Sequence, residues 1–132
     1  MAGCLKKLLT VVLVVVGYLG CGSSDDICGT TPAAGPNFAV QVDVVLLDLF
    51  MNTRYQSPDP SSGLTTYTST QPPDSIAGSG AATGTATCSS VVTGDSCYYC
   101  LYALAQYVDP CSKFTTGSAS YPQRCSIQFQ QL

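Results

Sequence analysis

The chain has 132 residues, with five basic side chains, eight aspartates and no histidine, so its formal net charge is −3. This length allows one domain with a modest hydrophobic core. An acidic chain of this kind lacks the basic stripe that a nucleic-acid backbone or an anionic membrane would require, so we expect neither partner.

Residues 1–22 have the layout of a secretory signal peptide. Two lysines lie near the start, residues 8–16 are an apolar run too short to span a bilayer, and small residues follow. We therefore expect residues 23–132 to be a single secreted domain with a net charge of 3 − 8 = −5. A lipoprotein signal that presents Cys21 as the lipid-bearing residue is the alternative, but no basic patch follows to supply the second signal for stable anchoring.

Residues 38–53 contain no helix breaker, and Asn37 can cap a helix in front of them. Large apolar residues recur there at helical spacing and predict a helix: Phe38, Val42, Val45, Leu46 and Leu49. A second apolar stripe lies nearly opposite and consists of Val40, Val44, Leu47 and Met51. Because a helix that is apolar on opposite faces is usually buried on both, we expect a later loop, residues 68–84, or a second helix to cover this stripe. If it is exposed instead, the stripe is a candidate interface for a partner or a second copy.

The rest of the chain alternates loops rich in glycine, proline, serine and threonine with short elements. We predict strands around residues 64–67 and 83–89, joined by a long surface loop. Asp95 and the serine after it are N-cap candidates for a second helix over residues 97–108, which an Asp-Pro pair ends. Residues 118–130 alternate enough to predict two strands or one bent hairpin.

Six cysteines lie beyond the signal peptide and its edge: Cys28, Cys88, Cys97, Cys100, Cys111 and Cys125. An even number in a secreted domain of about a hundred residues predicts three disulfides formed in an oxidising compartment, and the count alone leaves their pairing open. Cys97 and Cys100 also fit a redox-active C-x-x-C at a helix start, but the preceding βαβ pattern is missing. A thiolate zinc site is a further alternative, which the oxidising compartment and the lack of histidine disfavour.

The spacing C-x8-C-x2-C at Cys88, Cys97 and Cys100, within Ala-Thr-Cys and Asp-Ser-Cys-Tyr-Tyr-Cys, resembles the ginkbilobin-type domain of plant cysteine-rich secreted proteins and receptor-like kinase ectodomains. The resemblance covers nearly the whole chain after the signal peptide, including these positions of the first helix and the closing strand: Phe38, Val42, Leu46, Asp48, Leu49, Asn52, Thr53 and residues 128–130. It implies an α+β fold in which two helices pack on a small antiparallel β-sheet. It also implies three disulfide pairs: Cys28 with Cys111, Cys88 with Cys97, and Cys100 with Cys125.

The resemblance further implies a non-enzymatic binding protein of the plant apoplast, related to defence and antifungal proteins, without a cofactor. Some family members are similar to mannose-binding lectins, and their sugar-contacting asparagine, arginine and glutamate fall here on Gly29, Ala119 and Gln130. All three positions are substituted, which argues against mannose binding through this site. The expected partner is then another glycan or a cell-surface protein, and the domain is a monomer or a weak homodimer.

An enzyme would need a nucleophile with an activating base, or paired carboxylates in a cleft. Histidine is absent, and six of the eight aspartates are accounted for by loops and helix ends: Asp25, Asp26, Asp59, Asp74, Asp95 and Asp109. We therefore expect no catalytic activity, with a small secreted hydrolase as the remaining alternative.

Overall fold

The computed structural model describes residues 27–72 and 80–132. The predicted signal peptide, Cys21 and the middle of the loop at residues 68–84 lie outside this part of the chain. The helices and strands are α3 (Phe38–Asn52), β1 (Thr65–Gln71), β2 (Ala82–Cys88), α4 (Asp95–Val108), β3 (Thr116–Tyr121) and β4 (Cys125–Gln131). Short 3-10 turns follow the two helices: η1 (Thr53–Tyr55) and η2 (Asp109–Lys113).

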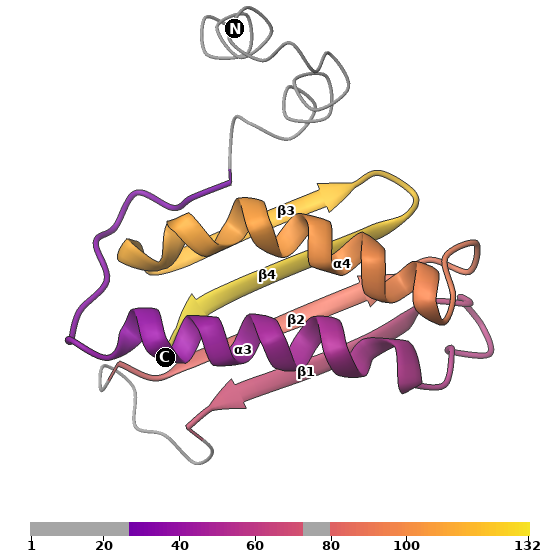
Figure 1. Ribbon diagram of the computed structural model, residues 1–132, viewed down its shortest axis with the longest axis horizontal. Helices are drawn as coiled ribbons and strands as arrows, with labels where there is room; N and C mark the ends of the chain where they lie inside the picture. Colours follow the sequence, from indigo (N-terminus) through magenta and orange to yellow (C-terminus); the bar gives the residue numbers. More distant parts are fainter. Residues whose placement is uncertain (1–26, 73–79) are drawn as a thin grey trace, which may run out of the picture.

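The four strands form one antiparallel sheet in the order β1-β2-β4-β3. Both helices lie side by side on the same face of this sheet, with α3 over β1 and β2 and α4 nearer to β3 and β4 (Figure 1). Together with three disulfides, this arrangement confirms the predicted α+β fold of two helices on an antiparallel sheet. The segment expected to form two strands or a bent hairpin is the β3–β4 hairpin.

The helix caps differ from the prediction. Gly94, not Asp95, occupies the N-cap of α4, and its φ of 55° is one that glycine adopts at little cost. Asp95 is the first helical residue, where its carboxylate interacts favourably with the N-terminal end of the helix dipole. Asn37 does precede α3, but its side chain makes no capping hydrogen bond.

The core lies between the helices and the sheet. Its α3 side is the first apolar stripe, as the helical spacing indicates: Phe38, Val42, Val45, Leu46 and Leu49. The two layers approach closely at Gly84 of β2, where an added Cβ would lie 2.6 Å from Val45 Cγ1 of α3; it would also lie 2.7 Å from the backbone oxygen of Gln128 in the neighbouring strand. Glycine at this position therefore allows α3 to sit close to the middle of the sheet.

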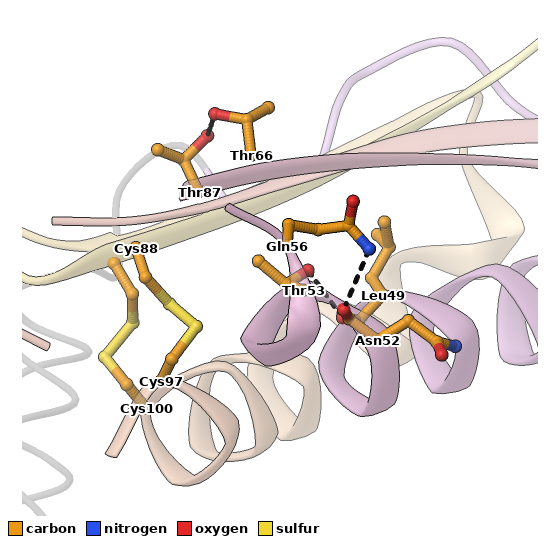
Figure 2. Close-up of a disulfide and its surroundings, with 10 residues drawn as sticks. Leu49, Asn52, Thr53, Gln56, Thr66, Thr87, Cys88, Cys97 and Cys100 are labelled. Atoms are coloured by element: carbon orange, nitrogen blue, oxygen red, sulfur yellow. Dashed lines mark hydrogen bonds between the residues drawn. A yellow bond between two sulfur atoms is a disulfide. The ribbon is translucent and has the colours of Figure 1, made fainter. Parts of the chain in front are cut away.

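The three disulfides have the pairing that the resemblance implies. Cys28 is bonded to Cys111, while the short C-x-x-C of α4 sends its two cysteines to different partners: Cys97 to Cys88 and Cys100 to Cys125. The Cys88–Cys97 bond joins the end of β2 to the first turn of α4 (Figure 2). The described cysteines are all in disulfides, so Cys97 and Cys100 do not form a redox pair with each other in this structure.

Candidate binding surfaces

The second apolar stripe of α3 is exposed, so the expectation that a loop or the second helix buries it is wrong. The exposed fractions are 59% for Val40, 39% for Val44, 50% for Leu47 and 42% for Met51. The physical reason is that α4 packs beside α3 and not above it, which leaves the side of α3 opposite the sheet uncovered (Figure 1). We refer to Val40, Val44, Leu47 and Met51 as the α3 face.

Aromatic side chains of α3 and α4 contact one another where the two helices lie side by side. Phe50 of α3 meets Tyr98 and Tyr102 of α4 edge to face, with ring centroids 5.5 Å and 5.3 Å apart. Phe50 lies one turn from Leu47 on α3, and Tyr102 is itself exposed. The apolar surface therefore continues from the α3 face through Phe50 onto Tyr102 of α4.

Carboxylates stand on both sides of the α3 face. On one side, a hydrogen bond with Asp109 of η2, burial and the negative charge of Asp109 together raise the pKa of Asp43 to about 6. On the other side, Asp48 accepts hydrogen bonds from Asn52 Nδ2 at 2.6 Å and from the Tyr67 hydroxyl at 3.2 Å. Burial and the negative charge of the Asp48 carboxylate in turn raise the pKa of the Tyr67 hydroxyl.

Arg54 anchors the end of α3 to the start of α4. Its Nη1 lies 3.1 Å from Asp95 Oδ1, and its guanidinium carbon lies 4.7 Å from the Tyr98 ring centroid and 4.8 Å from that of Tyr55. Because these contacts hold the guanidinium between two rings and a carboxylate, it does not pair with the carboxylates around the α3 face. The acidic rim of the α3 face is therefore not neutralised by this arginine.

The structure brings two of the three family sugar positions together. The Gly29 N–H donates to the Thr116 carbonyl at 2.9 Å, and Gln130 is paired with Thr116 in the β3–β4 ladder. A Cβ on Gly29 would lie 2.2 Å from Thr116 Oγ1, so a side chain there would displace this threonine. Ala119 does not join them, because it is 7% exposed and belongs to the core on the helix side of the sheet.

Sequence reasoning missed the Asp43–Asp109 pair and the Arg54 cluster. Each joins a residue of α3 or of the following turn η1 to a residue more than forty positions away, and no local pattern marks such a meeting. Within residues 27–72 and 80–132, no three metal-ligating side chains gather as they would around a metal ion. Among the helices described, none combines the length and apolar character needed to cross a bilayer.

No family model and no curated protein match the sequence. Among solved structures, the chain is similar to the tandem DUF26 ectodomain of the Arabidopsis thaliana cysteine-rich receptor-like protein PDLP5, with a TM-score of 0.64 and 15% sequence identity. The match covers 79% of this chain and 47% of that one, so this chain spans about half the length of the tandem ectodomain. DUF26 is the ginkbilobin-type domain, and the structural match confirms, for the fold, the resemblance found in the cysteine motif.

The fold is therefore that of a DUF26-like, cysteine-rich ectodomain. At this level of identity the likeness concerns the fold, and the surfaces of this chain must be judged from its own side chains. Two surfaces are open to a partner: the apolar α3 face, and the face of the sheet that the helices do not cover.

Proposed function

We propose that this protein is an extracellular, non-catalytic binding domain that contacts a protein partner through the α3 face. The observation that carries the proposal is the exposure of four large apolar side chains in consecutive turns of one helix. Contiguous apolar surface of this kind, bordered by polar residues, is typical of protein interaction sites. A helix face with anchors at these spacings suits a groove or a second helix on the partner.

The size of the α3 face suits a reversible contact. Full burial of a valine, leucine or methionine contributes roughly 1.5–3 kcal/mol, and these side chains are already about half buried, so the four together offer roughly 3–6 kcal/mol. Association itself costs roughly 4–15 kcal/mol in lost translational and rotational freedom, which equals or exceeds this contribution. Strong binding would therefore need further contacts from the acidic rim or from the aromatic side chains of Phe50 and Tyr102.

The acidic rim indicates the chemistry of the partner. Asp43 and Asp48 lie on opposite sides of the α3 face, so a partner with basic residues around an apolar centre would be complementary to both. A second copy would bring like charges close together, which restricts self-association to a weak homodimer. The favoured partner is therefore a different extracellular protein with a basic rim.

The extracellular location is supported by the three disulfides and by the likeness to an ectodomain. The non-catalytic character is supported by the cysteine-motif resemblance. The paired carboxylates of Asp43 and Asp109 are exposed on the helix layer. Apoplastic location and a role in defence belong to the same proposal and follow from that resemblance.

The test is a binding screen of the purified, oxidised domain against a panel of extracellular receptor domains. Leu47→Asp should abolish binding to any partner found, whereas Val91→Asp, which changes an apolar residue that lies away from α3 and is more exposed than Leu47, should leave it unchanged. Sedimentation of the domain over a range of concentrations reports on self-association. A partner that binds Leu47→Asp and the parent equally well would refute the proposal.

A further inference from the structure

The two outer strands of the sheet, β1 and β3, differ in what lies beside them. The entry segment of the chain runs along the outer side of β3: the Gly29 N–H donates to the Thr116 carbonyl at 2.9 Å, and the Ser118 N–H donates to the Ile27 carbonyl at 2.8 Å. No labelled element lies beside the outer side of β1 (Figure 1). Among the described residues, β1 is therefore the open edge of the sheet.

Strand alternation determines which backbone groups of β1 face outward. In an antiparallel ladder, the N–H and C=O groups of one residue point to the same neighbouring strand, and those of the next residue point the other way. The Ser89 N–H, one residue past β2, donates to the Arg124 carbonyl on the β4 side, so Cys88 and every second residue before it point towards β1. The partner of Cys88 in β1 is Thr65, and the residues that point outward are therefore the alternate ones: Thr66, Thr68 and Thr70.

The backbone groups of these threonines form a strip of defined length, which we call the β1 edge. No residue that the structure describes makes a backbone hydrogen bond to them on the outer side. The strip ends at Leu64, whose N–H donates to the Ser62 hydroxyl at 3.3 Å and whose carbonyl accepts from the Asp59 N–H at 2.8 Å. At its other end follows Pro72, which has no N–H to donate.

The β1 edge lacks the features that keep exposed strands from pairing. Natural edge strands are commonly protected by charged side chains, by proline or by a β-bulge. β1 contains only threonine, tyrosine, serine and glutamine, and its register against β2 runs without a bulge from Thr65 to Gln71. Threonine and tyrosine also favour the extended backbone of a strand. The edge can therefore accept another extended strand.

The two ends of the β1 edge favour one register and one kind of strand. In an antiparallel pair of two copies with Thr68 opposite itself, Thr66 of each copy lies opposite Thr70 of the other, so all three threonines exchange backbone hydrogen bonds. The same register sets Leu64 opposite Pro72 of the other copy. Because the Leu64 backbone groups are already bonded and Pro72 has no N–H, neither residue loses a partner there. A pairing shifted by two residues would set one of the threonines against Leu64 or Pro72 instead.

The threonine side chains already make the contacts that such pairing would repeat. Their hydroxyl groups pair with those of β2 across the ladder: Thr66 with Thr87 at 3.3 Å, Thr68 with Thr85 at 3.3 Å and Thr70 with Thr83 at 2.9 Å. Figure 2 shows the first pair on the side of the sheet away from the helices. Because a hydroxyl has one donor and two acceptor positions, each can bond to a second threonine as well. Pairing of two β1 edges would therefore extend the threonine rows into the other copy.

Asp48 limits the strength of this pairing. Its carboxylate accepts a hydrogen bond from the Tyr67 hydroxyl at 3.2 Å, which places it on the helix side of β1. Two paired copies would bring two such carboxylates to the same face of the extended sheet, and salt screens their repulsion. The affinity should therefore be modest and should rise with ionic strength.

We propose that two copies of this protein associate through the β1 edge, antiparallel and with Thr68 opposite Thr68, to form one continuous sheet. The occupant is a second copy because the closed ends of the edge match each other in this register, whereas an unrelated extended segment would gain nothing from them. The strand itself carries no charge, so the two edges meet without the repulsion that acidic surfaces of this chain would cause elsewhere. The proposal is separate from the α3 face, which lies on the side of α3 opposite the sheet.

Sedimentation velocity of the oxidised domain, from about 10 µM to about 1 mM, measures this association. We expect a monomer–dimer equilibrium within this range, with more dimer in about 0.5 M than in about 0.05 M sodium chloride. Thr68→Lys should lower the affinity at least about tenfold, because two lysines would lie opposite each other across the new ladder. Ser118→Lys changes an exposed hydroxyl residue on the same face of the other outer strand; it is the matched control and should associate as the parent does.

A mixture of two variants tests the register. Thr68→Lys and Thr68→Glu should each associate weakly alone and should form a mixed dimer when combined, because opposite charges then meet across the ladder. Amide hydrogen exchange of the unaltered domain covers the case in which a variant does not fold. The exchange of the N–H groups of Thr66, Thr68 and Thr70 should slow as the protein concentration rises, while that of β3 should not change.

Three results would overturn the proposal directly: a domain that stays monomeric at about 1 mM, association that Thr68→Lys leaves unchanged, and concentration-dependent protection on α3 or β3 but not on β1. Absence of a mixed dimer would overturn the register with Thr68 opposite itself. Leu47→Asp changes the α3 face and leaves the β1 edge intact, so it should not alter the dimer. The two single variants therefore separate the failure of this proposal from the failure of the α3 face as a binding site.

Discussion

Replacing Asp43 by asparagine is expected to stabilise the protein at neutral pH and to lose this effect in acid. Its pKa is raised from 3.8 to about 6 by the hydrogen bond with Asp109, by burial and by the charge of Asp109. Between these two pH values the folded protein holds the proton more tightly than the unfolded chain does. The stability of the parent therefore rises as the pH falls through about 6 towards 3.8, and it decreases again as the pH rises.

The magnitude follows from the shift and from the exposure of the pair. A change in pKa from 3.8 to about 6 would correspond to about 3 kcal/mol in a site shielded from water. Both carboxyl groups are exposed, and solvent screening reduces such interactions strongly, so we expect Asp43→Asn to gain about 0.5–1 kcal/mol at pH 7. Near pH 4, where the parent carboxyl is protonated, the gain should vanish.

Urea unfolding of the parent and of Asp43→Asn near pH 7 and near pH 4 measures both values. Asp59→Asn is a control of opposite sign, because hydrogen bonds from the Ser61 N–H and hydroxyl lower the pKa of Asp59, and removal of its charge should not stabilise the protein. The reasoning is refuted if Asp43→Asn is no more stable than the parent at pH 7. It is also refuted if the gain is the same at both pH values.

Three further changes probe the packing. Gly84→Ala should cost about 1–3 kcal/mol in urea unfolding, since the new methyl group would press on Val45 of α3 and on the backbone oxygen of Gln128 in β4, and an unchanged midpoint would show that these neighbours can shift without cost. Replacement of Cys28 and Cys111 by alanine should cost about 4.5 kcal/mol, because their bond closes a loop with a sequence separation of 83; a loss under about 1 kcal/mol would contradict the chain-entropy argument. Arg54→Met keeps the packing of the aliphatic stem but removes the charge, and should lower the free energy of unfolding by about 1 kcal/mol. Because the two aromatic rings account for most of the interaction, this loss should depend little on salt, and a loss that disappears at high salt would contradict this.

The sequence alone determined the fold class and the inner face of the first helix. Phe38, Val42 and Leu49 recur at a period that only a helix places on one side, and burial in the structure follows that period. The spacing of Cys88, Cys97 and Cys100 led to the correct family of folds, because cysteine positions constrain which elements can be joined.

Periodicity could not decide what covers the other side of the helix. It identified Val40 and Leu47 as part of a second apolar stripe. Their exposure depends on α4 packing beside α3, which is decided by contacts between distant residues. The same limit applies to Ala119. The face of the sheet on which its side chain lies depends on the register of β3 against β4, and a shift of that register by one residue would move the side chain to the other face.

Only the tertiary structure placed Asp43 beside Asp109 and joined the alternating threonines of β1 and β2 to the glutamines of β4 in one face. The period-two pattern at residues 66–70 and 83–87 is visible in the sequence, yet the strand order that makes the patterns adjacent is not. Local patterns report which side chains share a face of one element, because they depend on backbone geometry alone. Which faces meet, and which remain open to a partner, is decided by contacts between residues far apart in the chain.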